Sequence, residues 1–441
     1  MNRRPAGKAP TALARWAGGV ELLGDTYAQI TAGIHEFHRA IARQPFRTVD
    51  AIPTLGSGAA PVRVLHDGIT DAVYTGVREI GALAFTLAGG ALKLVEQQTS
   101  EVEATASAHP RTDLAFSALS GLFGDHLIGR RNPVAPQFGL YVDGLKIETD
   151  RSSLAARFPD AEPRLVVFVH GLCCNETSWQ LYRQAGVRQS LPYGARLAEH
   201  GYTPLYLRYN SGAHISQNGR RLARLLQQLL TQWPRAVEDI TLIGHSMGGL
   251  VIRSAAAAGL RRGDAWTGKV GSLICLGSPH QGAALERGAQ ALAQVLQGFE
   301  LSRPWARVLE ARSVGIRDLR FGATSDADWR DGLKRDWRPP ASIARLADAQ
   351  YHFIGCSVGD DEHDWRGKLL GDGLVHLPSS LAKELADADT AVLFRRHHMQ
   401  LLNDPAVYAL IAERLGVTTP PAASPAHRRT VQPRRAARPR R

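Results

Sequence analysis

From residue 138 onward, short apolar runs alternate with stretches of helical periodicity, and this alternation limits the possible folds more than any other feature of the chain. The runs are short and rich in Val, Ile and Leu, whereas the stretches between them carry apolar residues at helical spacing. Such alternation is typical of βαβ units and predicts a mostly parallel sheet with helices on both faces. We expect strands at Leu165–Val169, Thr203–Leu207, Ile240–Ile243, Ser272–Leu276, Tyr351–Ile354 and Ala391–Phe394.

A hairpin precedes the alternating region. Phe138–Val142 and Leu145–Thr149 flank Asp143-Gly144, a pair that favours a tight turn. Further along, one helix is marked by Leu222, Leu225, Leu226, Leu229 and Leu230, and another is expected to follow Asp404 and to end near Leu415.

The first 130 residues have a different pattern and are expected to form a helical N-terminal module. One apolar stripe runs from Leu23 to Ile41 and a second from Val73 to Leu94, with a loop rich in Pro and Gly at Pro53–Pro61 between them. We expect the two helices to pair or to pack on the body, with contact to a membrane surface as the alternative for the second.

The interval between the fourth and fifth expected strands of the parallel region is longer than a simple crossover needs. It contains a helical stripe, Leu285–Phe299, and the large side chains of Trp305, Trp329 and Trp337. We therefore expect residues 131–417 to form an α/β domain with a cap insertion at about 283–347.

The positive charge of the chain is concentrated at its end. The segment Arg428–Arg441 carries seven arginines and no acid, and without it the formal net charge falls from +12 to +5. We expect residues 418–441 to be a disordered basic tail. The tail can touch membrane phosphates in a peripheral contact or can meet RNA, but no specific nucleic-acid partner is implied.

The cysteines and the N-terminus indicate the compartment. Cys173, Cys174, Cys275 and Cys356 show neither a zinc-type spacing nor a disulfide framework, so free thiols are expected. Neither a signal peptide nor a spanning segment is apparent, since the longest uncharged run near the N-terminus, Ile80–Leu92, is shorter than the roughly 20 residues that a spanning helix needs. The expected location is the cytoplasm.

The strongest chemical motif is Gly244-His245-Ser246-Met247-Gly248. It follows the expected strand Ile240–Ile243 and precedes a helix-forming run, which is the strand–turn–helix context of a nucleophile elbow. Glycines two residues before and after the serine remove side chains that would collide in the strained turn. Ser246 is therefore the expected nucleophile, against the alternative of a glycine-rich βα turn with an incidental serine.

A serine needs a base and an orienting acid, which in this chain order follow it as an acid and then a histidine. Asp372 follows the strand Tyr351–Ile354 and is favoured over Asp360, Asp361 and Asp364, whose cluster is typical of an exposed charged turn. The base is one of two neighbours that follow the last strand, and the pattern alone leaves the choice between them open: His397 and His398.

The third requirement is an oxyanion hole made of backbone N–H groups. One donor is expected from Met247, directly after the nucleophile, and the other from Leu172 in the loop after the first parallel strand. His170 and His245 flank the site, and we interpret both as structural.

These motifs resemble the lipase/esterase branch of the α/β-hydrolase superfamily and are similar to those of bacterial triacylglycerol lipases and of the hydrolase domain of GPI inositol-deacylases. The matching segments are residues 167–171, the elbow, residues 276–282, residues 371–375 and residues 398–402. The resemblance implies the α/β-hydrolase fold. In this family the acid often lies in an Asp-Gly-x-Val context, which supports Asp372. The family's histidine is followed shortly by two leucines, and this register selects His398. Cys173-Cys174 departs from the small residues expected beside the oxyanion loop.

The resemblance also implies an activity. The expected reaction is hydrolysis of a small-molecule or lipid carboxylic ester through an acyl-enzyme, with Ser246, His398 and Asp372 as the triad, and no metal or organic cofactor is implied. A thioesterase, an amidase or an acyltransferase would use the same triad. A non-catalytic protein that binds a lipid or a partner on this fold is the alternative from another class.

Overall fold

The computed structural model of the 441-residue chain describes residues 14–25, 110–182, 191–282, 313–326, 343–364, 377–381 and 388–417. It also describes short runs between residues 27 and 92, and residues 328, 372 and 375. The loop expected at Pro53–Pro61, the helical stripe Leu285–Phe299, the three tryptophans at 305, 329 and 337 and the basic tail lie outside the described residues.

Contacts divide the chain into two compact units. The first comprises residues 1–108, 126–135 and 287–312, and the second comprises residues 109–125, 136–286 and 313–441. The described residues 110–125, which the sequence pattern placed in the N-terminal module, thus group with the sheet.

In the first unit, two helical stretches pack against each other. The residues at 14–25 and 85–90 are helical. A Cβ on Gly24 would lie 2.7 Å from Cβ of Phe85, and the rings of Tyr27 and Phe85 are 5.7 Å apart. A glycine is needed at position 24 because Phe85 occupies the space that a side chain would take.

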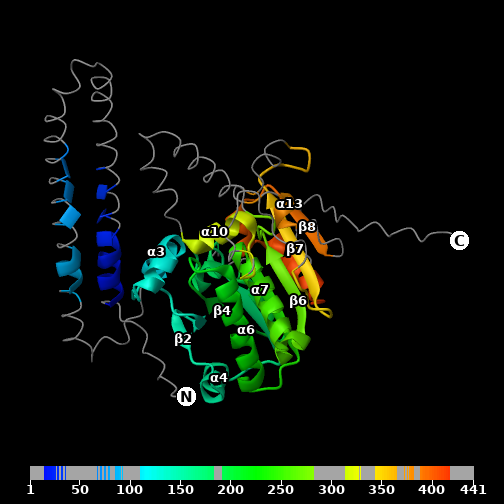
Figure 1. The fold of residues 1–441 in the computed structure, drawn as a ribbon. Helices are drawn as coiled ribbons and strands as arrows, with labels where there is room; N and C mark the ends of the chain where they lie inside the picture. The colour runs from blue at the N-terminus through cyan, green and yellow to red at the C-terminus, as the bar shows by residue number, and fades with distance from the viewer. Residues whose placement is uncertain are drawn as a thin grey trace. The chain divides into compact units, whose positions relative to one another are not determined.

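The second unit contains an eight-stranded sheet with the order β2-β1-β4-β3-β5-β6-β7-β8 (Figure 1). β1 pairs antiparallel with β2 and with β4, and all the other neighbours are parallel. The six parallel strands cover the expected runs with small extensions, whereas the two hairpin strands are shorter than the expected runs. The strands are β1 Gly139–Val142, β2 Leu145–Ile147, β3 Arg164–Val169, β4 Tyr202–Arg208, β5 Asp239–His245, β6 Val270–Leu276, β7 Gln350–Ser357 and β8 Asp389–Phe394.

The hairpin between β1 and β2 forms at the expected dipeptide. Asp143 has φ 51° and Gly144 has φ 78°, so both central residues of the turn adopt the left-handed conformation that a two-residue hairpin requires. Val142 pairs with Leu145 across the turn.

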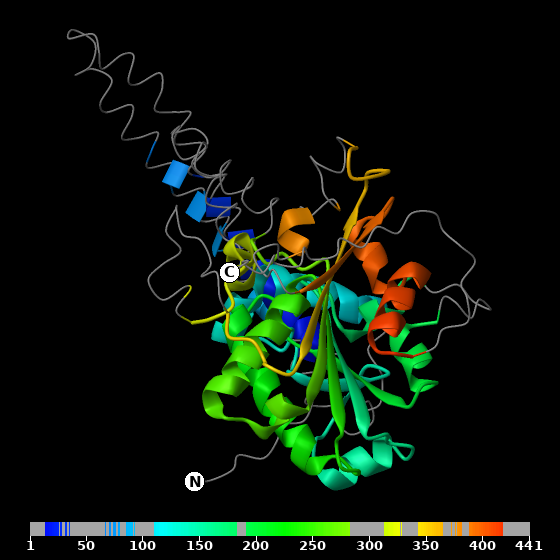
Figure 2. The same ribbon diagram turned by 90° about the vertical axis from the view of Figure 1, so that its right-hand side faces the viewer.

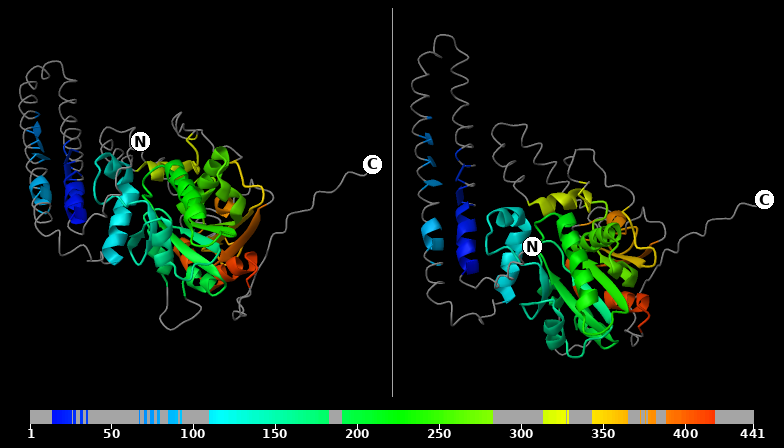
Figure 3. Two further views of the ribbon diagram at one scale, coloured as in Figure 1. Left: turned by 90° about the horizontal axis from the view of Figure 1, so that it is seen from below. Right: turned by 60° about the horizontal axis from the view of Figure 1, so that its bottom comes forward.

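Helices cover both faces of the sheet, as Figures 2 and 3 show. The amphipathic α6, Ile215–Gln232, carries the expected leucine stripe and packs against α7, Met247–Arg262. The structure also describes these helices and 3-10 turns: α3 Pro110–Gly129, α4 Arg151–Arg157, η1 Glu176–Gln180, α5 Tyr193–Ala198, η3 Ala265–Lys269, α10 Val314–Phe321, α13 Leu377–Ser380, η4 His398–Leu402 and α14 Pro405–Arg414.

Successive side chains of a strand point to opposite faces of the sheet, so each strand contributes alternate side chains to two separate cores. Leu165, Val167 and Val169 of β3 join the core beneath α6 and α7. Val166 and Phe168 join the core on the other face, which α5 and α14 cover. A parallel sheet that is buried on both faces reads as continuous apolar runs.

These observations confirm the predicted fold class, an α/β-hydrolase fold with a mostly parallel central sheet. Among the described residues, no helix is both long enough and apolar enough to cross a bilayer.

Candidate active site

The sharp turn between β5 and α7 carries Ser246. Its backbone has φ 53° and ψ −122°, a conformation that costs of the order of 1–3 kcal/mol for a residue with a side chain. A Cβ on Gly244 would lie 2.5 Å from the carbonyl carbon of Gly248, and one on Gly248 would lie 2.1 Å from the carbonyl oxygen of Val169. The turn therefore needs both glycines, as expected for a nucleophile elbow.

The turn leaves one side chain within reach of solvent. From Ile240 to Leu250 every residue is buried except Ser246, which is half-buried. The N–H of Ser246 donates to the carbonyl oxygen of Leu276 at 2.8 Å, which fixes the turn to the end of β6.

Two further predicted residues, Asp372 and His398, are in direct contact. Nδ1 of His398 donates to Oδ2 of Asp372 at 2.7 Å, and both side chains are buried. The N–H of His398 also donates to the carbonyl oxygen of Asp372 at 3.0 Å, and the other carboxylate oxygen, Oδ1, accepts from the N–H of Val375 at 2.8 Å. Because Nδ1 carries the proton, Nε2 is left with the lone pair that a general base requires.

The alternative residues lie elsewhere. His397 is exposed, and its ring meets the ring of Tyr182 edge to face, with 5.9 Å between the centroids. Asp361 accepts from the N–H groups of its own turn, and the exposed Asp360 pairs with Arg395. The structure thus joins His398 to Asp372 rather than to this turn.

The elbow and the imidazole of His398 both lie against the end of β6. Gly277 follows Leu276, the acceptor of the Ser246 N–H, and has φ 61°. A Cβ on Gly277 would lie 3.2 Å from both Cε1 and Nδ1 of His398. The ring of His245, next to the serine, lies 4.8 Å from the ring of His398, centroid to centroid.

The expected oxyanion loop lies against the serine. A Cβ on Gly171 would lie 3.0 Å from Cβ of Ser246, a tight contact, so a glycine favours this close approach of the loop. Leu172 follows Gly171, and Met247 begins α7. Among the described residues, no acceptor binds the N–H of Leu172 or of Met247.

The other two histidines of the site are buried and neutral. Burial holds the pKa of His170 down at about 3, and Tyr209 donates its N–H to Nε2 of that ring at 3.3 Å. Burial, reinforced by the neighbouring His398, holds the pKa of His245 well below its ordinary value of 6.5. Nε2 of His245 donates to the carbonyl oxygen of His398 at 3.2 Å, so this ring supports the backbone of the predicted base.

Sequence reasoning missed two contributors to this arrangement. Gly277 was part of a matching segment, but its contact with the imidazole depends on how β6 ends against η4. The support from His245 joins residues 153 positions apart, and no local pattern signals such a contact.

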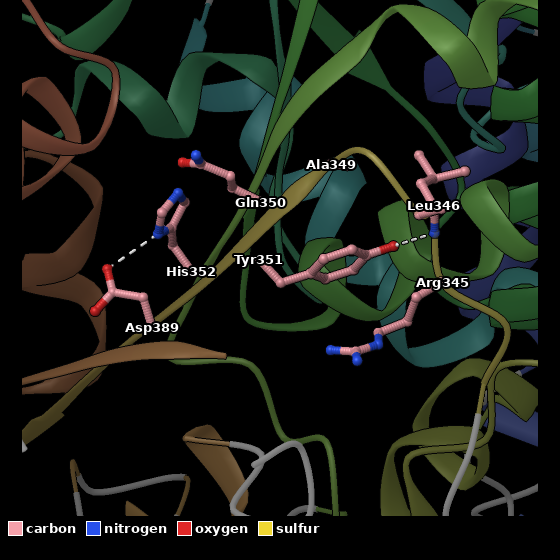
Figure 4. A pocket seen from close by; sticks show the side chains of 8 residues that line it. Arg345, Leu346, Ala349, Gln350, Tyr351, His352 and Asp389 are labelled. Atoms are coloured by element: carbon pink, nitrogen blue, oxygen red, sulfur yellow. Dashed lines mark hydrogen bonds and ion pairs between the residues drawn. The ribbon is translucent and has the colours of Figure 1, made fainter. Parts of the chain in front are cut away.

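A pocket of about 650 Å³ lies at the opposite end of the sheet (Figure 4). It is lined by the start of β7 and of β8, where Nδ1 of His352 lies 3.0 Å from the carboxylate of Asp389. The hydroxyl of Tyr351 accepts from the N–H of Leu346 at 3.0 Å. Since Ser246 lies at the carboxyl ends of the strands, this pocket is separate from the candidate active site.

Residues 160–299 of the chain match the family model described as the PGAP1-like alpha/beta domain. That segment contains Leu172, Ser246 and Met247, whereas Asp372 and His398 lie beyond it. No curated protein matches the chain by sequence.

Several solved structures are similar to this chain. A lipase from Bacillus licheniformis in its mature form is 18% identical, with a TM-score of 0.38 over 58% of this chain and 93% of that chain. A lipase-esterase related protein from Clostridium acetobutylicum is 16% identical, with a TM-score of 0.34 over 58% of this chain and 94% of that chain. An esterase from Pyrococcus furiosus is 12% identical, with a TM-score of 0.34 over 58% of this chain and 82% of that chain.

Proposed function

We propose that the chain, whose sheet has the α/β-hydrolase arrangement and whose residues 160–299 match the PGAP1-like alpha/beta domain, hydrolyses a carboxylic ester of a small molecule or lipid. Ser246 is the proposed nucleophile, His398 the general base and acid, and Asp372 the residue that orients the imidazole. The 2.7 Å hydrogen bond between His398 and Asp372, beside the elbow, is the observation that carries the proposal.

In the first half of the proposed reaction, Oγ of Ser246 attacks the ester carbonyl carbon while its proton passes to Nε2 of His398. The carbonyl oxygen becomes an oxyanion, which accepts from the N–H groups of Leu172 and Met247. Asp372 stabilises the imidazolium without taking its proton. An oxyanion donor of this kind raises kcat by about 10²–10³-fold.

The intermediate then collapses and the bond to the alcohol oxygen breaks. His398 gives the proton to the departing alkoxide, and an acyl-enzyme remains on Ser246. A water molecule, deprotonated by the same Nε2, attacks the acyl carbonyl and releases the acid, and His398 returns the proton to Oγ.

The test compares the wild-type chain with Ser246→Ala. The wild type is expected to turn over p-nitrophenyl esters and to be labelled by a fluorophosphonate probe at Ser246, whereas Ser246→Ala should show neither at unchanged thermal stability. Undiminished turnover by Ser246→Ala, or a wild type that neither reacts with the probe nor hydrolyses any ester in a series from acetate to palmitate, would contradict the proposal.

The leaving group is tested separately. Matched acyl groups presented as ester, thioester and anilide separate ester hydrolysis from the reactions that the same triad also runs. We expect the highest kcat/KM for the ester, and a preference for the thioester or the anilide would reassign the reaction while leaving the roles of the triad intact.

A further inference from the structure

Helix α3 precedes the first strand of the sheet, yet part of it packs on the loops that form the candidate active site. Residues 109–125 belong to the same compact unit as the sheet. Within this segment the helix departs from regular geometry at Phe123, with φ −124° and ψ 18°. Two glycines flank the kink, Gly121 and Gly124, and each meets a different loop.

Gly121 meets the oxyanion loop. A Cβ at this position would lie 2.4 Å from Sγ of Cys173, 2.9 Å from its backbone nitrogen and 3.0 Å from its Cα. Sγ of Cys173 in turn lies 3.6 Å from the carbonyl oxygen of Ala118. Cys173 directly follows Leu172 and has φ 60°, a left-handed conformation that is uncommon for a residue with a side chain. The helix thus contacts the backbone of the loop one residue beyond the proposed oxyanion donor.

Gly124 meets the loop that follows β4. A Cβ on Gly124 would lie 2.1 Å from Oδ1 of Asn210. Ser120 donates its hydroxyl to that oxygen at 2.9 Å, and Nδ2 of Asn210 donates to the carbonyl oxygen of Gly124 at 3.0 Å. The same loop supports the oxyanion loop, because Oγ of Ser211 accepts from the N–H of Cys173 at 3.1 Å.

A buried group of charges ties the helix to both loops. The guanidinium of Arg208, at the end of β4, contacts Asp113 of α3 at 3.1 Å and Glu176 of η1, where Nε lies 2.6 Å from the carboxylate. The side chains of all three residues are at most 7% exposed. Removing one partner of such a group leaves an uncompensated buried charge, so the arrangement holds α3, η1 and β4 in one geometry.

We propose that α3 is a positioning element for the oxyanion hole: its close contact at Gly121 with Cys173 sets the backbone of the loop and thereby the direction of the Leu172 N–H. This inference rests on the proposed function. A misplacement of about 1 Å in a catalytic group can cost roughly 10²-fold in rate, so a helix that touches the loop backbone can control the rate without touching the substrate.

The first test is Gly121→Ala, with Gly129→Ala as the matched control. Both residues lie in α3, and both substitutions favour the helix, but a Cβ on Gly129 meets nothing within 4 Å. Gly121→Ala should lower kcat for a p-nitrophenyl ester by about 10- to 100-fold with KM changed by less than about threefold. Gly129→Ala should leave both constants unchanged.

The second test is rescue. Cys173→Gly removes the sulfur that the new methyl group at position 121 would meet, and it places a glycine at a position with positive φ. The double variant Gly121→Ala/Cys173→Gly should recover part of the kcat that Gly121→Ala loses, because the sulfur contact is removed while the contacts with the backbone nitrogen and Cα of residue 173 remain. Affinity for a phosphonate transition-state analogue, whose charged oxygen occupies the oxyanion hole, should fall and recover in parallel with kcat.

The outcomes are distinguishable. A wild type that neither labels nor turns over an ester overturns the proposed function and this inference together. An active wild type with equal kcat for Gly121→Ala and Gly129→Ala overturns the inference alone, and so does a loss in kcat that Cys173→Gly does not relieve. If Gly121→Ala fails to fold, Ser120→Ala removes only the hydroxyl that binds Asn210, and the inference then requires a several-fold lower kcat and weaker phosphonate binding at unchanged KM.

Discussion

Nδ1 of His398 and the carboxylate of Asp372 are joined by a 2.7 Å hydrogen bond between side chains that are both buried. The two residues follow different strands, β8 and β7, and their contact forms where those strands end side by side. An acceptor fixed at Nδ1 leaves Nε2 as the basic nitrogen, which is the tautomer that the proposed reaction needs. The same contact holds the ring in one orientation.

Asp372→Asn is expected to lower kcat by about 10³–10⁴-fold, because an amide can present its N–H to Nδ1 and thereby select the wrong tautomer. Steady-state kinetics on a p-nitrophenyl ester measure the effect. Asp361→Asn is the matched control in the exposed turn, and there kcat should be unchanged. A loss of less than tenfold for Asp372→Asn would argue against its proposed role.

The adjacent histidines give a second comparison. His398→Gln should abolish turnover, since the proposed proton carrier is removed, whereas His397→Gln should keep nearly full kcat because that side chain is exposed and packs on Tyr182. Fluorophosphonate labelling of both variants provides an independent readout. Greater loss in His397→Gln than in His398→Gln would reverse the assignment.

The elbow glycine Gly248 has no space for a side chain. Gly248→Ala would place Cβ 2.1 Å from the carbonyl oxygen of Val169, so we expect activity to be lost and the free energy of unfolding to fall by about 1–3 kcal/mol. Urea denaturation and ester kinetics measure the two effects. Gly268→Ala, where a Cβ meets nothing within 4 Å, should change neither, and a stable, active Gly248→Ala would show that the turn relaxes easily.

Three buried histidines should make the fold sensitive to acid. Burial lowers the pKa of His170 to about 3 and holds those of His245 and His280 well below the ordinary 6.5. Below pH 6.5 the unfolded chain binds protons that the native rings do not, so stability is full above that pH and is lost as the pH falls toward 3. Each such ring steepens the loss by up to about 1.4 kcal/mol per pH unit.

Urea unfolding between pH 7.5 and 4.5 checks this expectation. His397→Gln serves as the control, because that side chain is exposed in the native chain, and the variant should leave the slope unchanged. A flat stability profile across this range would mean that the buried rings accept protons without cost.

The cysteine beside the oxyanion loop should be unreactive. Burial, with a smaller contribution from Cys174, raises the pKa of the Cys173 thiol to about 11, so at pH 8 only about one molecule in 10³ carries the thiolate. Ellman's reagent should therefore label Cys173 slowly in the native chain and all four cysteines rapidly in urea, with the native rate rising toward pH 11. Mass spectrometry identifies the site, and rapid native labelling of Cys173 at pH 8 would contradict the expectation.

Local pattern was sufficient for much of the fold. The apolar runs placed all six parallel strands, Asp143-Gly144 placed the hairpin turn, and the leucine stripe placed α6. The local sequence pattern also located Ser246 in a sharp turn. Side chains at positions 244 and 248 would collide with the turn itself and with the neighbouring strand, so both positions need glycine. The choice of His398 came from a resemblance, and the contact of His398 with Asp372 agrees with it.

Other features depended on residues distant in the chain. The packing of Gly121 against Cys173, the support that His245 gives to His398 and the burial of Arg208 between Asp113 and Glu176 all join segments that have no shared local pattern. Periodicity and turn chemistry depend only on residues that are close together in the chain. The amino-acid sequence by itself therefore determined the local features, namely the strands, the helices and the elbow. The surroundings of the predicted catalytic groups were decided by which loops meet at one edge of the sheet, and that depends on strand order and packing.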